Sequence, residues 1–494
     1  MKKAFLVLLV LAVSGSAVFA GGRKSSGGEP VKTATFLFFG DKTDRMSEFV
    51  ANDMPEYLKK KGLNISVDLQ VLPWSEGNAR DVRLASGEDF TSFIEVETMS
   101  QYYAKGYLAD ATDYIAQYGK NLTREVDQSS FDSFKINGRS YAIPYGNKPN
   151  ASEFFAVCVR QDLLEKVGMK EIKTLEDLER FAVAGLKLDP AYIGYGGQGS
   201  LTGFGAFRMM SRIVSDKNIR FLTNFLFTDE SAKDARVFSY FESEEFKKYA
   251  AIARRWNQLG IISPQQMSDP LMAWSKMLAG QGLFYDGVAG RVWENLPSVR
   301  AAVPTAKLKN YFIGDAKGRP LVSRGTYSTA FFIPANAKYP EAYVQVLDAC
   351  YESQESFDFF TYGMQGKDFQ LNSAGKLTSR TNTQVFYNDW ASNIAKWLRY
   401  ESFVDDDVIQ DYINWDKGAI LQKDIGFVFD LEPVKVEDAQ LNNVLLEYMT
   451  PIAWGFVDYD TAWPEAQRRL KDAGIDRYVA EFQRQFSAWY AANK

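Results

Sequence analysis

The sequence predicts an α/β fold built on doubly wound, largely parallel sheets. Short apolar runs of strand type alternate with segments of helical spacing, which is the pattern of sheets covered by helices on both faces. The 494 residues are 46% apolar and 24% charged, an ordinary globular composition. At about 150 residues per domain, two or three domains are expected.

The alternation is clearest over residues 33–96. The first strand (TATFLFF) is a mainly apolar run rich in residues of strand type, and the second (NISVDLQVL) alternates. Pro55 lies inside the first helical segment and is expected to kink or split it. Ligands of such sheets bind beyond the carboxyl ends of the strands. The predicted elements are strands over 33–39, 64–72 and 90–96, and helices over 46–58 and 79–85.

A second alternating unit follows, and the tail is helical. Leu441, Val444, Leu445 and Tyr448 keep the i, i+3, i+4, i+7 spacing of one helix face. The predicted elements of this part are strands over 154–159, 282–285 and 321–333, and helices over 244–259 and 340–351.

Residues 1–20 are predicted to be a secretory signal peptide. Two lysines precede an apolar run, and Val18 and Ala20 place small residues at −3 and −1 of a cut. The run is shorter than the roughly 20 residues of a membrane anchor. No cysteine follows the cut, and residues 21–32 read as a flexible tether. We therefore expect an exported or periplasmic, soluble protein without a lipid anchor.

The composition excludes several kinds of chemistry. The sequence has no histidine, which removes Ser-His-Asp and Cys-His catalysis and His-ligated zinc. Its two cysteines, Cys158 and Cys350, provide neither a disulfide framework nor a four-cysteine metal site, and we predict two free, buried thiols. A net charge of −5 without a basic run argues against nucleic-acid binding. No cofactor or metal is predicted.

Several motifs in order resemble one family. These are NGRSYAIP at 137–144, AKGYLAD at 104–110, VRQDLL at 159–164, YGMQGKDF at 362–369, and tail segments around 426–434 and 470–476. The set resembles the family 1 extracellular solute-binding proteins of ABC importers. Within that family it is similar to the oligosaccharide-type, LipO-like subgroup with its characteristic C-terminal region. The resemblance covers nearly the whole mature chain, but the lipobox cysteine of many relatives is missing.

The resemblance implies a two-lobe periplasmic-binding-protein fold, each lobe a doubly wound sheet flanked by helices, with the ligand cleft between them. The N-terminal lobe is expected to contain 33–147 and 318–378, and the C-terminal lobe 148–317 and 379–494. The crossings are expected near 145–150, 310–320 and 375–385. The implied function is that of a non-enzymatic, monomeric receptor. It would capture a carbohydrate, an oligosaccharide, by lobe closure and deliver it to the permease subunits.

The predicted ligand residues of the first lobe follow its strand ends. Asp41 and Lys42 end the first strand and could exchange hydrogen bonds with sugar hydroxyls, or belong to a helix cap and solvated loop. Trp74 offers a flat indole for a sugar face, or packs at the edge of the core. Glu95 and Glu97 end the third strand, and could equally be a charge pair on the rim.

The other predicted ligand residues lie at the crossings and in the second unit. Tyr145 and Asn147 follow the first crossing and could instead serve only the hinge. Tyr327 is close to the second crossing and is the weaker candidate. A loop from the strand at 282–285 contributes the remaining four, of which the tryptophan could equally be core: Tyr285, Asp286, Arg291 and Trp293.

Two other functions stay open at this stage. One is a receptor for a peptide or anionic solute. The other is a glycosidase, which would need two facing carboxylates, one of them with a raised pKa. The GYGGQG run at 194–199 matches a dinucleotide-binding pattern, but without the expected acidic partner it reads as a glycine turn. The acidic run at 405–407 reads as a solvated turn or helix start rather than a calcium loop.

Overall fold

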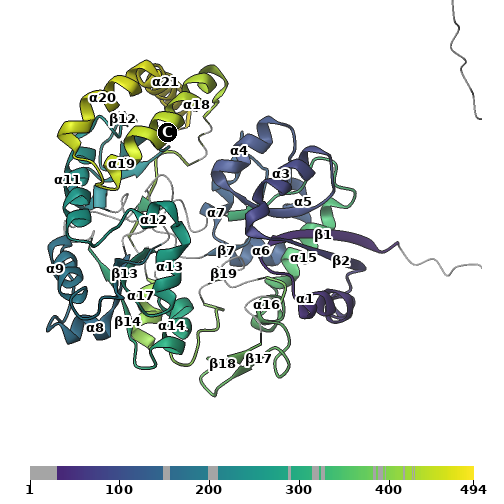
Figure 1. Ribbon diagram of the computed structural model, residues 1–494. Coiled ribbons are helices and arrows are strands. Elements are labelled where there is room, and N and C mark those ends of the chain that lie inside the picture. Colours follow the sequence, from purple (N-terminus) through teal and green to yellow (C-terminus); the bar gives the residue numbers. More distant parts are fainter. Residues whose placement is uncertain are drawn as a thin grey trace, which may run out of the picture.

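The protein has two α/β lobes that lie side by side (Figure 1). The computed structural model describes residues 30–147, 156–197, 210–287, 291–313, 322–323, 329–381, 385–387, 393–394, 396–414, 418–425, 427 and 429–493. The first lobe contains the N-terminal strands together with α15 (Pro340–Cys350) and α16 (Gln354–Tyr362). The second contains the middle of the chain and the C-terminal helices. Each lobe is thus built from separate stretches of chain, as the resemblance implied.

The sheet of the first lobe has the strand order β2-β1-β3-β16-β6. β1 (Lys32–Phe39) pairs in parallel with β2 (Ile65–Leu72) and β3 (Thr91–Glu95), which confirms the predicted parallel alternation. β16 (Thr329–Phe331) is antiparallel to β3, and β6 (Ile143–Pro144) is antiparallel to β16 and so runs in the direction of β1, β2 and β3. β1 runs from the outer side of the lobe toward the second lobe, so the carboxyl ends of the parallel strands point that way (Figure 1).

The helix after β1 is continuous but irregular. Pro55 is the second residue of α2, and a π-helical turn, η1, directly precedes α2 in the same helix, so the hydrogen-bond spacing changes where the proline lacks its N–H. The expected disruption is therefore a widened turn rather than a break. The remaining elements of this lobe are α1 (Asp44–Glu48), η1 (Phe49–Asp53), α2 (Met54–Lys60), η2 (Trp74–Glu76), α3 (Gly77–Ala85), α4 (Val96–Ala104), α5 (Thr112–Tyr118), α6 (Lys120–Glu125), α7 (Gln128–Ser133), and the hairpins β4 (Lys135–Ile136)–β5 (Arg139–Ser140) and β17 (Phe369–Leu371)–β18 (Leu377–Arg380).

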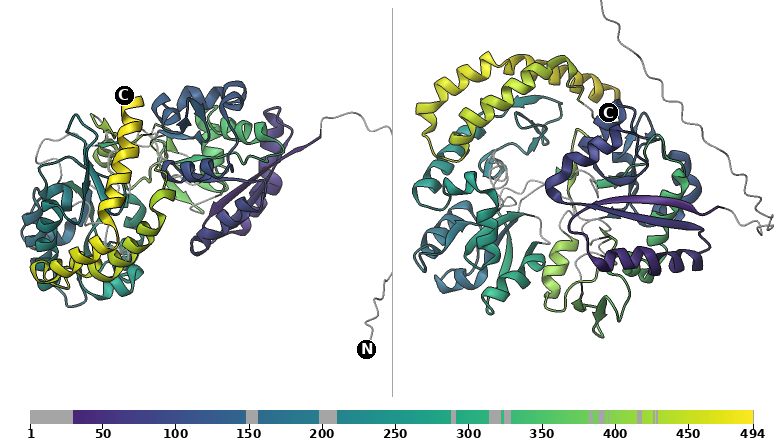
Figure 2. Two further views of the ribbon diagram at one scale, coloured as in Figure 1. Left: turned by 90° about the horizontal axis from the view of Figure 1, so that it is seen from above. Right: turned by 45° about the vertical axis from the view of Figure 1, so that its right-hand side comes forward.

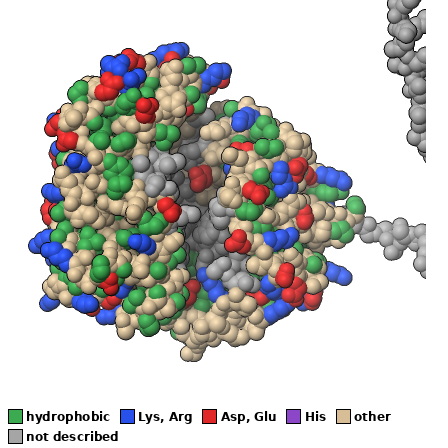
Figure 3. Space-filling model, in the orientation of Figure 1, with side chains coloured by type: hydrophobic (Ala, Val, Ile, Leu, Met, Phe, Trp, Pro, Cys, Tyr) green, Lys and Arg blue, Asp and Glu red, His purple; other side chains and the backbone are tan. Residues whose placement is uncertain are grey.

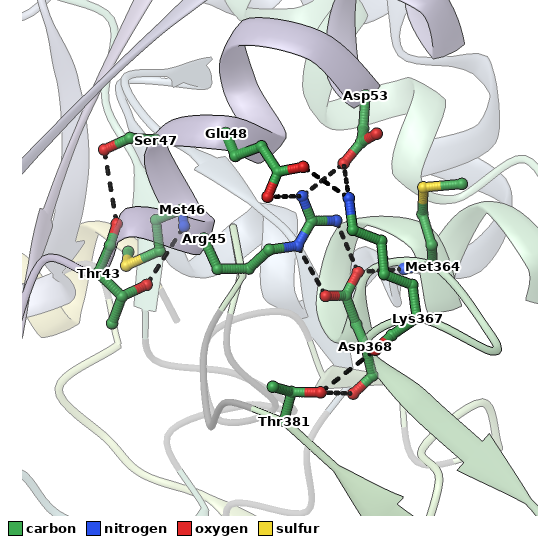
Figure 4. Close-up of polar contacts among 10 residues, drawn as sticks. All are labelled: Thr43, Arg45, Met46, Ser47, Glu48, Asp53, Met364, Lys367, Asp368 and Thr381. Atoms are coloured by element: carbon green, nitrogen blue, oxygen red, sulfur yellow. Dashed lines mark hydrogen bonds and ion pairs between the residues drawn. The ribbon is translucent and has the colours of Figure 1, made fainter.

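An ion-pair cluster ties α1 to the loop that follows α16 (Figure 4). Arg45 donates two hydrogen bonds to the two carboxylate oxygens of Asp368, each 2.7 Å long, and a third guanidinium nitrogen lies 2.6 Å from Asp53. Lys367 and Glu48 form a more exposed pair, 2.8 Å apart. Burial is the largest single influence and acts to raise the pKa of Asp368, but the hydrogen bonds from Arg45 and the Met364 N–H, together with the charges of Arg45 and Lys367, lower the pKa overall. The predicted YGMQGKDF motif thus has a structural role in this lobe.

The main sheet of the second lobe is mixed, with the order β14-β8-β13-β9. β8 is antiparallel to β13 and to β14, and only β13 and β9 are parallel. A separate antiparallel sheet has the order β10-β11-β12. The strands are β8 (Ala156–Arg160), β9 (Ile193–Tyr195), β10 (Ile219–Phe221), β11 (Leu226–Asp229), β12 (Val237–Ser239), β13 (Gly282–Gly287) and β14 (Leu308–Phe312).

The C-terminal helices arch over the second lobe (Figure 2). α21 carries Phe482 and Phe486 into the same hydrophobic core as Trp256 of α11 and Phe225, so distant segments share one core. The helices of this lobe are α8 (Gln161–Lys166), α9 (Leu175–Gly185), α11 (Glu244–Gln258), α12 (Gln265–Ser268), α13 (Pro270–Leu278), α14 (Arg291–Ala302), α17 (Asp406–Ile413), η4 (Glu432–Val434), α18 (Lys435–Val444), η5 (Leu445–Met449), α19 (Thr450–Ala453), α20 (Tyr459–Asp472) and α21 (Ile475–Asn493).

Short strand pairs accompany the passages between the lobes. β7 (Gly146–Asn147) pairs with β19 (Asn393–Ile394), and β15 (Val322–Ser323) pairs with β20 (Ile420–Leu421). The core of the first lobe includes Phe386, which lies beyond the expected boundary at 378. This ring packs 5.3 Å from that of Phe36 in β1, a contact between segments that no local pattern reveals.

The two cysteines lie in different lobes, Cys158 on β8 and Cys350 at the end of α15. Both are free and buried, as predicted. Burial raises the pKa of the Cys158 thiol to about 12. The described part of the chain holds no helix with the length and apolar character needed to cross a bilayer.

Candidate functional site

Polar side chains gather where the parallel strands of the first lobe end. Phe36 of β1 lies beside Thr91 of β3, so in the same register Gly40 lies level with Glu95. Asp41 and Lys42 follow directly and are exposed, as is Glu95. The structure therefore brings these three predicted residues to one edge of the sheet. The helix cap that follows is Thr43, whose hydroxyl accepts the Met46 N–H, so Asp41 is left for other partners.

An arginine that the sequence did not single out lies under this edge. The Arg80 guanidinium on α3 donates to the Phe93 carbonyl at 2.9 Å and lies over the rings of Phe39 and Tyr102, 5.6 and 5.7 Å from their centroids. The Tyr102 hydroxyl donates to Asp81. Burial, followed by this hydrogen bond, raises the pKa of Tyr102. The sequence predicted this helix after the second strand. A basic residue in its first turn was the signal that could have identified Arg80.

The second lobe presents a matching edge at the end of β13. Phe284 lies beside Tyr195 of the parallel strand β9, so Asp286 lies level with Gly197. The Tyr195 hydroxyl donates to Asp286, and the Gln266 amide donates to the Tyr195 carbonyl at 2.6 Å. These bonds fix the half-buried Asp286 carboxylate in place. Asp286 was predicted, whereas Tyr195 was missed because the glycines after it read as a plain turn.

Two predicted aromatic ligands lie inside the cores instead of at a surface. Tyr145 and Tyr285 both have an exposed fraction of 0%. The Tyr145 ring lies 4.5 Å from that of Phe331, and the Tyr285 hydroxyl accepts a hydrogen bond from Asn295 at 3.0 Å. Neither side chain presents a face to a ligand here: Tyr145 is covered by a segment far along the chain, whereas Tyr285 packs against Trp274 and Asn295, which are near it in the sequence. The expectation that these rings face the cleft is therefore corrected.

Trp293 is also a core residue, which was the alternative that the sequence left open for it. Its exposed fraction is 8%, and it packs edge-on against Tyr400 and Tyr412, with centroids 5.6 and 4.9 Å away. The neighbours come from a segment more than a hundred residues further along. Tyr327 lies outside the described residues, and so do four predicted side chains whose backbones are described: Trp74, Glu97, Asn147 and Arg291.

A groove runs between the two lobes (Figure 3). Acidic side chains are visible on its walls in that view. The strand ends of the first lobe point toward it, since β1 runs toward the second lobe (Figure 1). Carboxylates and amides on opposite walls can accept and donate hydrogen bonds to a polyhydroxylated molecule between them.

The raised carboxyl pKa values of the described residues have structural causes. Burial comes first among the causes that raise the pKa of Glu230, Asp348 and Asp438. Asp348 accepts the Asn121 and Leu122 N–H groups at the start of α6, and Glu230 accepts the Lys423 N–H. None of the three is at the strand ends described above. They do not form the facing acid and base of a glycosidase at this site.

The remaining sequence motifs serve the fold. Gly194 is on β9, where a Cβ atom would lie 2.6 Å from the Ile261 carbonyl oxygen, so close packing requires glycine. Residues 405–407 begin α17, as expected for a helix start, and Lys376 lies 2.7 Å from Asp406. Within the described ranges, no group of three or more acidic or cysteine side chains is placed to hold a metal ion.

Comparison with known proteins fits this geometry. A family model described as bacterial extracellular solute-binding protein matches residues 40–356, and a model described as a domain of unknown function matches residues 424–491. The chain is 22% identical to a carbohydrate ABC transporter substrate-binding protein of Streptococcus pneumoniae serotype 4, over 95% of this chain and 93% of that protein.

Solved structures share the fold over nearly the whole length. The N-glycan transport solute-binding protein NgtS of Streptococcus pneumoniae superposes with a TM-score of 0.76 at 21% identity, covering 94% of this chain and 100% of that one. Its complex with Man1GlcNAc gives a TM-score of 0.70 at 20% identity, over 93% and 100% of the two chains. The two-lobe fold and the resemblance read from the motifs are both confirmed. Since the family model spans more than half of the sequence, the chain belongs to the bacterial extracellular solute-binding proteins.

Proposed function

We propose that this protein is the extracytoplasmic receptor of an ABC importer. It captures an oligosaccharide in the groove between its lobes, closes on it without chemical conversion, and delivers it to the permease. The observation that carries the proposal is the pair of polar strand-end edges, one in each lobe, with Asp41, Lys42 and Glu95 on one and Asp286 on the other. Lobe closure would bring these edges together around a ligand and exclude water.

The chemistry of the edges favours a neutral sugar over an anionic solute. Among the described side chains at the first edge, Asp41 and Glu95 outnumber the one exposed cation, Lys42, and Asp286 is held by Tyr195 at the other edge. Carboxylates accept hydrogen bonds from hydroxyl groups and repel a carboxylated ligand. The curated relative is named as a carbohydrate receptor, and the solved relative binds Man1GlcNAc. Trp74 stays our candidate for stacking on a sugar face, together with Glu97, Asn147, Arg291 and Tyr327 as further ligand residues.

We also propose that the mature protein begins at Gly21, carries no acyl chain and acts as a monomer. Support comes from the leader pattern that ends at Ala20 and the cysteine-free segment after it. Mass spectrometry of the protein from its native envelope tests the processing, and sedimentation tests the monomer. A lipid adduct or a stable dimer would contradict this part.

Binding to a broad glycan array, followed by calorimetry with the sugars that bind, tests the main proposal. We expect a neutral oligosaccharide to bind, to change tryptophan emission on lobe closure, and to be recovered intact. The bound protein should also stimulate ATP hydrolysis by its permease in proteoliposomes. Binding only of peptides or organic acids would overturn the carbohydrate assignment, and cleavage of the sugar would favour the glycosidase.

A further inference from the structure

The C-terminal region, residues 424–491, faces the first lobe across a groove with two cavities. The first, of about 450 Å³, lies between this region, β10 and Gln101 of α4. The second, of about 700 Å³, lies between α21 and the tip of the β4–β5 hairpin at Asn137. Phe427 lines both cavities, so they adjoin. Figure 2 shows the end of α21 close to the first lobe.

We propose that this groove is an extension subsite, which binds the sugar units that reach beyond the strand ends. The inference rests on the proposed function and gives the C-terminal region a part in selecting long ligands. α4 connects the two places, because it starts directly after Glu95 and carries Gln101 six residues later. At 1.5 Å per residue, the two positions are about 9 Å apart along the helix. One oligosaccharide can span that distance.

The wall formed by the C-terminal region is a fixed aromatic surface. The half-buried Phe427 ring lies 5.0 Å from Phe486 and 5.6 Å from Trp489, and Trp489 stacks on Phe486 at an interplanar angle of 11°. Gln485 holds the loop that carries Phe427: its carbonyl accepts the Asp430 N–H at 2.8 Å, and its amide donates to the Asp430 carbonyl at 2.9 Å. Flat rings held in this way suit the apolar faces of sugars.

The opposite wall offers neutral polar groups. Gln101 and Asn137 are exposed amides on the first lobe, and an amide both donates and accepts hydrogen bonds. Lys135 lies 2.7 Å from Asp132, the Arg484 guanidinium of α21 lies 2.6 Å from Glu481, and Arg220 lies 3.6 Å from Asp424. Burial raises the pKa of Asp438, the other carboxyl group at the first cavity, which favours its neutral form. Rings on one side and amides on the other are the chemistry of a neutral oligosaccharide rather than of an anion.

The test compares two tryptophans of the C-terminal helices that are equally half-buried and stacked. Trp489 borders the groove, whereas Trp463 stacks on Tyr459 of α20, with the rings 5.4 Å apart at 11°. The full-length protein is screened on an array of neutral oligosaccharides of about two to nine units. The dissociation constants of the shortest and longest sugars that bind are then measured for Trp489→Ala and Trp463→Ala.

We expect Trp489→Ala to raise the dissociation constant of the longest sugar by at least about fivefold, the size of a moderate hot spot. The dissociation constant of the shortest sugar should stay within about twofold. Trp463→Ala should change neither. Gln101→Ala on the first lobe should weaken binding of the longest sugar only, by about threefold for one lost hydrogen bond. The control Gln117→Ala on α5 should leave the binding of both sugars unchanged. The exposed Gln101 keeps the test decisive if a tryptophan variant fails to fold.

The outcomes separate this inference from the function on which it rests. If sugars bind but neither Trp489→Ala nor Gln101→Ala changes the dependence on chain length, the extension subsite is wrong and the receptor stands. An equal loss for short and long sugars would place these residues in the main site, which also overturns the inference. If no neutral sugar on the array binds, the proposed function fails first.

Discussion

Both lobes join their separate stretches of chain through an apolar core, and the first lobe adds a buried ion-pair cluster. In the first lobe, a compact ion-pair cluster links Arg45 to Asp368 across 323 residues of sequence. In the second, long amphipathic helices bring Phe482 and Phe486 into an aromatic core. The difference follows from the segments themselves. The segment 362–369 buries Tyr362 and Phe369 at its two ends and carries Lys367 and Asp368 between them to Glu48 and Arg45, whereas α21 has a whole apolar face.

The largest loss of stability is expected when one partner of the ion-pair cluster is removed and the other stays buried. Arg45→Ala leaves the Asp368 side chain, only 2% exposed, without its bidentate partner. The loss of stability should be about 3–5 kcal/mol, as for other buried pairs deprived of one partner. Lys367→Ala removes a half-exposed pair and should cost under about 1 kcal/mol. Urea unfolding followed by circular dichroism measures both. Equal effects would mean that the cluster does not hold the lobe.

The corresponding change in the second lobe is Phe482→Ala in α21. It removes a buried ring from the shared core and should cost about 3 kcal/mol, the lower end for such truncations. Because the lost interaction is apolar, the cost should be nearly the same at low and high salt, unlike that of the exposed Lys367 pair. Unfolding in urea at two salt concentrations tests this. A cost that falls strongly with salt would contradict the apolar account.

Acid should change the stability of the two lobes in opposite directions. The pKa of Asp368 is lowered, so its contribution to stability is present above the unfolded pKa, about 4, and is lost as the pH falls below that value. The pKa of Glu230 in the second lobe is raised, mainly by burial and then by Asp424. Its contribution is therefore complete at acid pH and lost as the pH rises through the folded pKa.

Hydrogen exchange of peptides from each lobe, measured between pH 3 and 7, follows these two titrations separately. We expect peptides around Asp368 to lose protection below about pH 4. Asp368→Asn should abolish this pH dependence, and Glu230→Gln should abolish the gain in the second lobe on mild acidification. If both lobes lose protection in parallel in the unmodified protein, the contrast between the two carboxyl groups is wrong.

The ligand edges of the two lobes should contribute smaller and similar amounts. Glu95→Gln and Asp286→Asn each remove the charge of a hydrogen-bond acceptor and should weaken binding by about 1–2 kcal/mol. Glu95 is exposed, so its change should alter stability by less than about 0.5 kcal/mol. Calorimetry with a sugar found on the array gives the binding constants. Normal binding by both variants would remove these residues from the ligand site.

The smallest effect concerns the cysteines, one in each lobe. The native protein should not react with a thiol reagent at pH 8, because both thiols are buried and burial raises the pKa of Cys158 to about 12. In denaturant, two thiols should react both before and after reduction. Any reaction that needs prior reduction would reveal a disulfide and contradict the assignment of one cysteine to each lobe.

The sequence predicted what depends on local patterns. The parallel strands β1, β2 and β3 follow from apolar runs, and Asp286 follows from its place after such a run. The ring positions depend on distant partners: Tyr145 is covered by Phe331 and Trp293 by Tyr412. No local spacing tells whether such a partner exists. For the same reason the core contact of Phe386 with Phe36 could not be foreseen.

The widened turn η1 has a consequence for the geometry of the ion-pair cluster. In a regular α-helix, the eighth residue after Arg45 would lie about 80° around the axis from it, since each residue turns about 100°. A π turn takes more residues per revolution, so it brings Asp53 back into line with Arg45 and Glu48 (Figure 4). The extra residue in this turn thus offsets the rotation that would otherwise separate Asp53 from Arg45. Deleting one residue from 49–52 would restore regular winding and still leave Asp53, then the seventh residue after Arg45, only about 20° from it around the axis, whereas regular winding without a deletion would carry Asp53 away from the guanidinium.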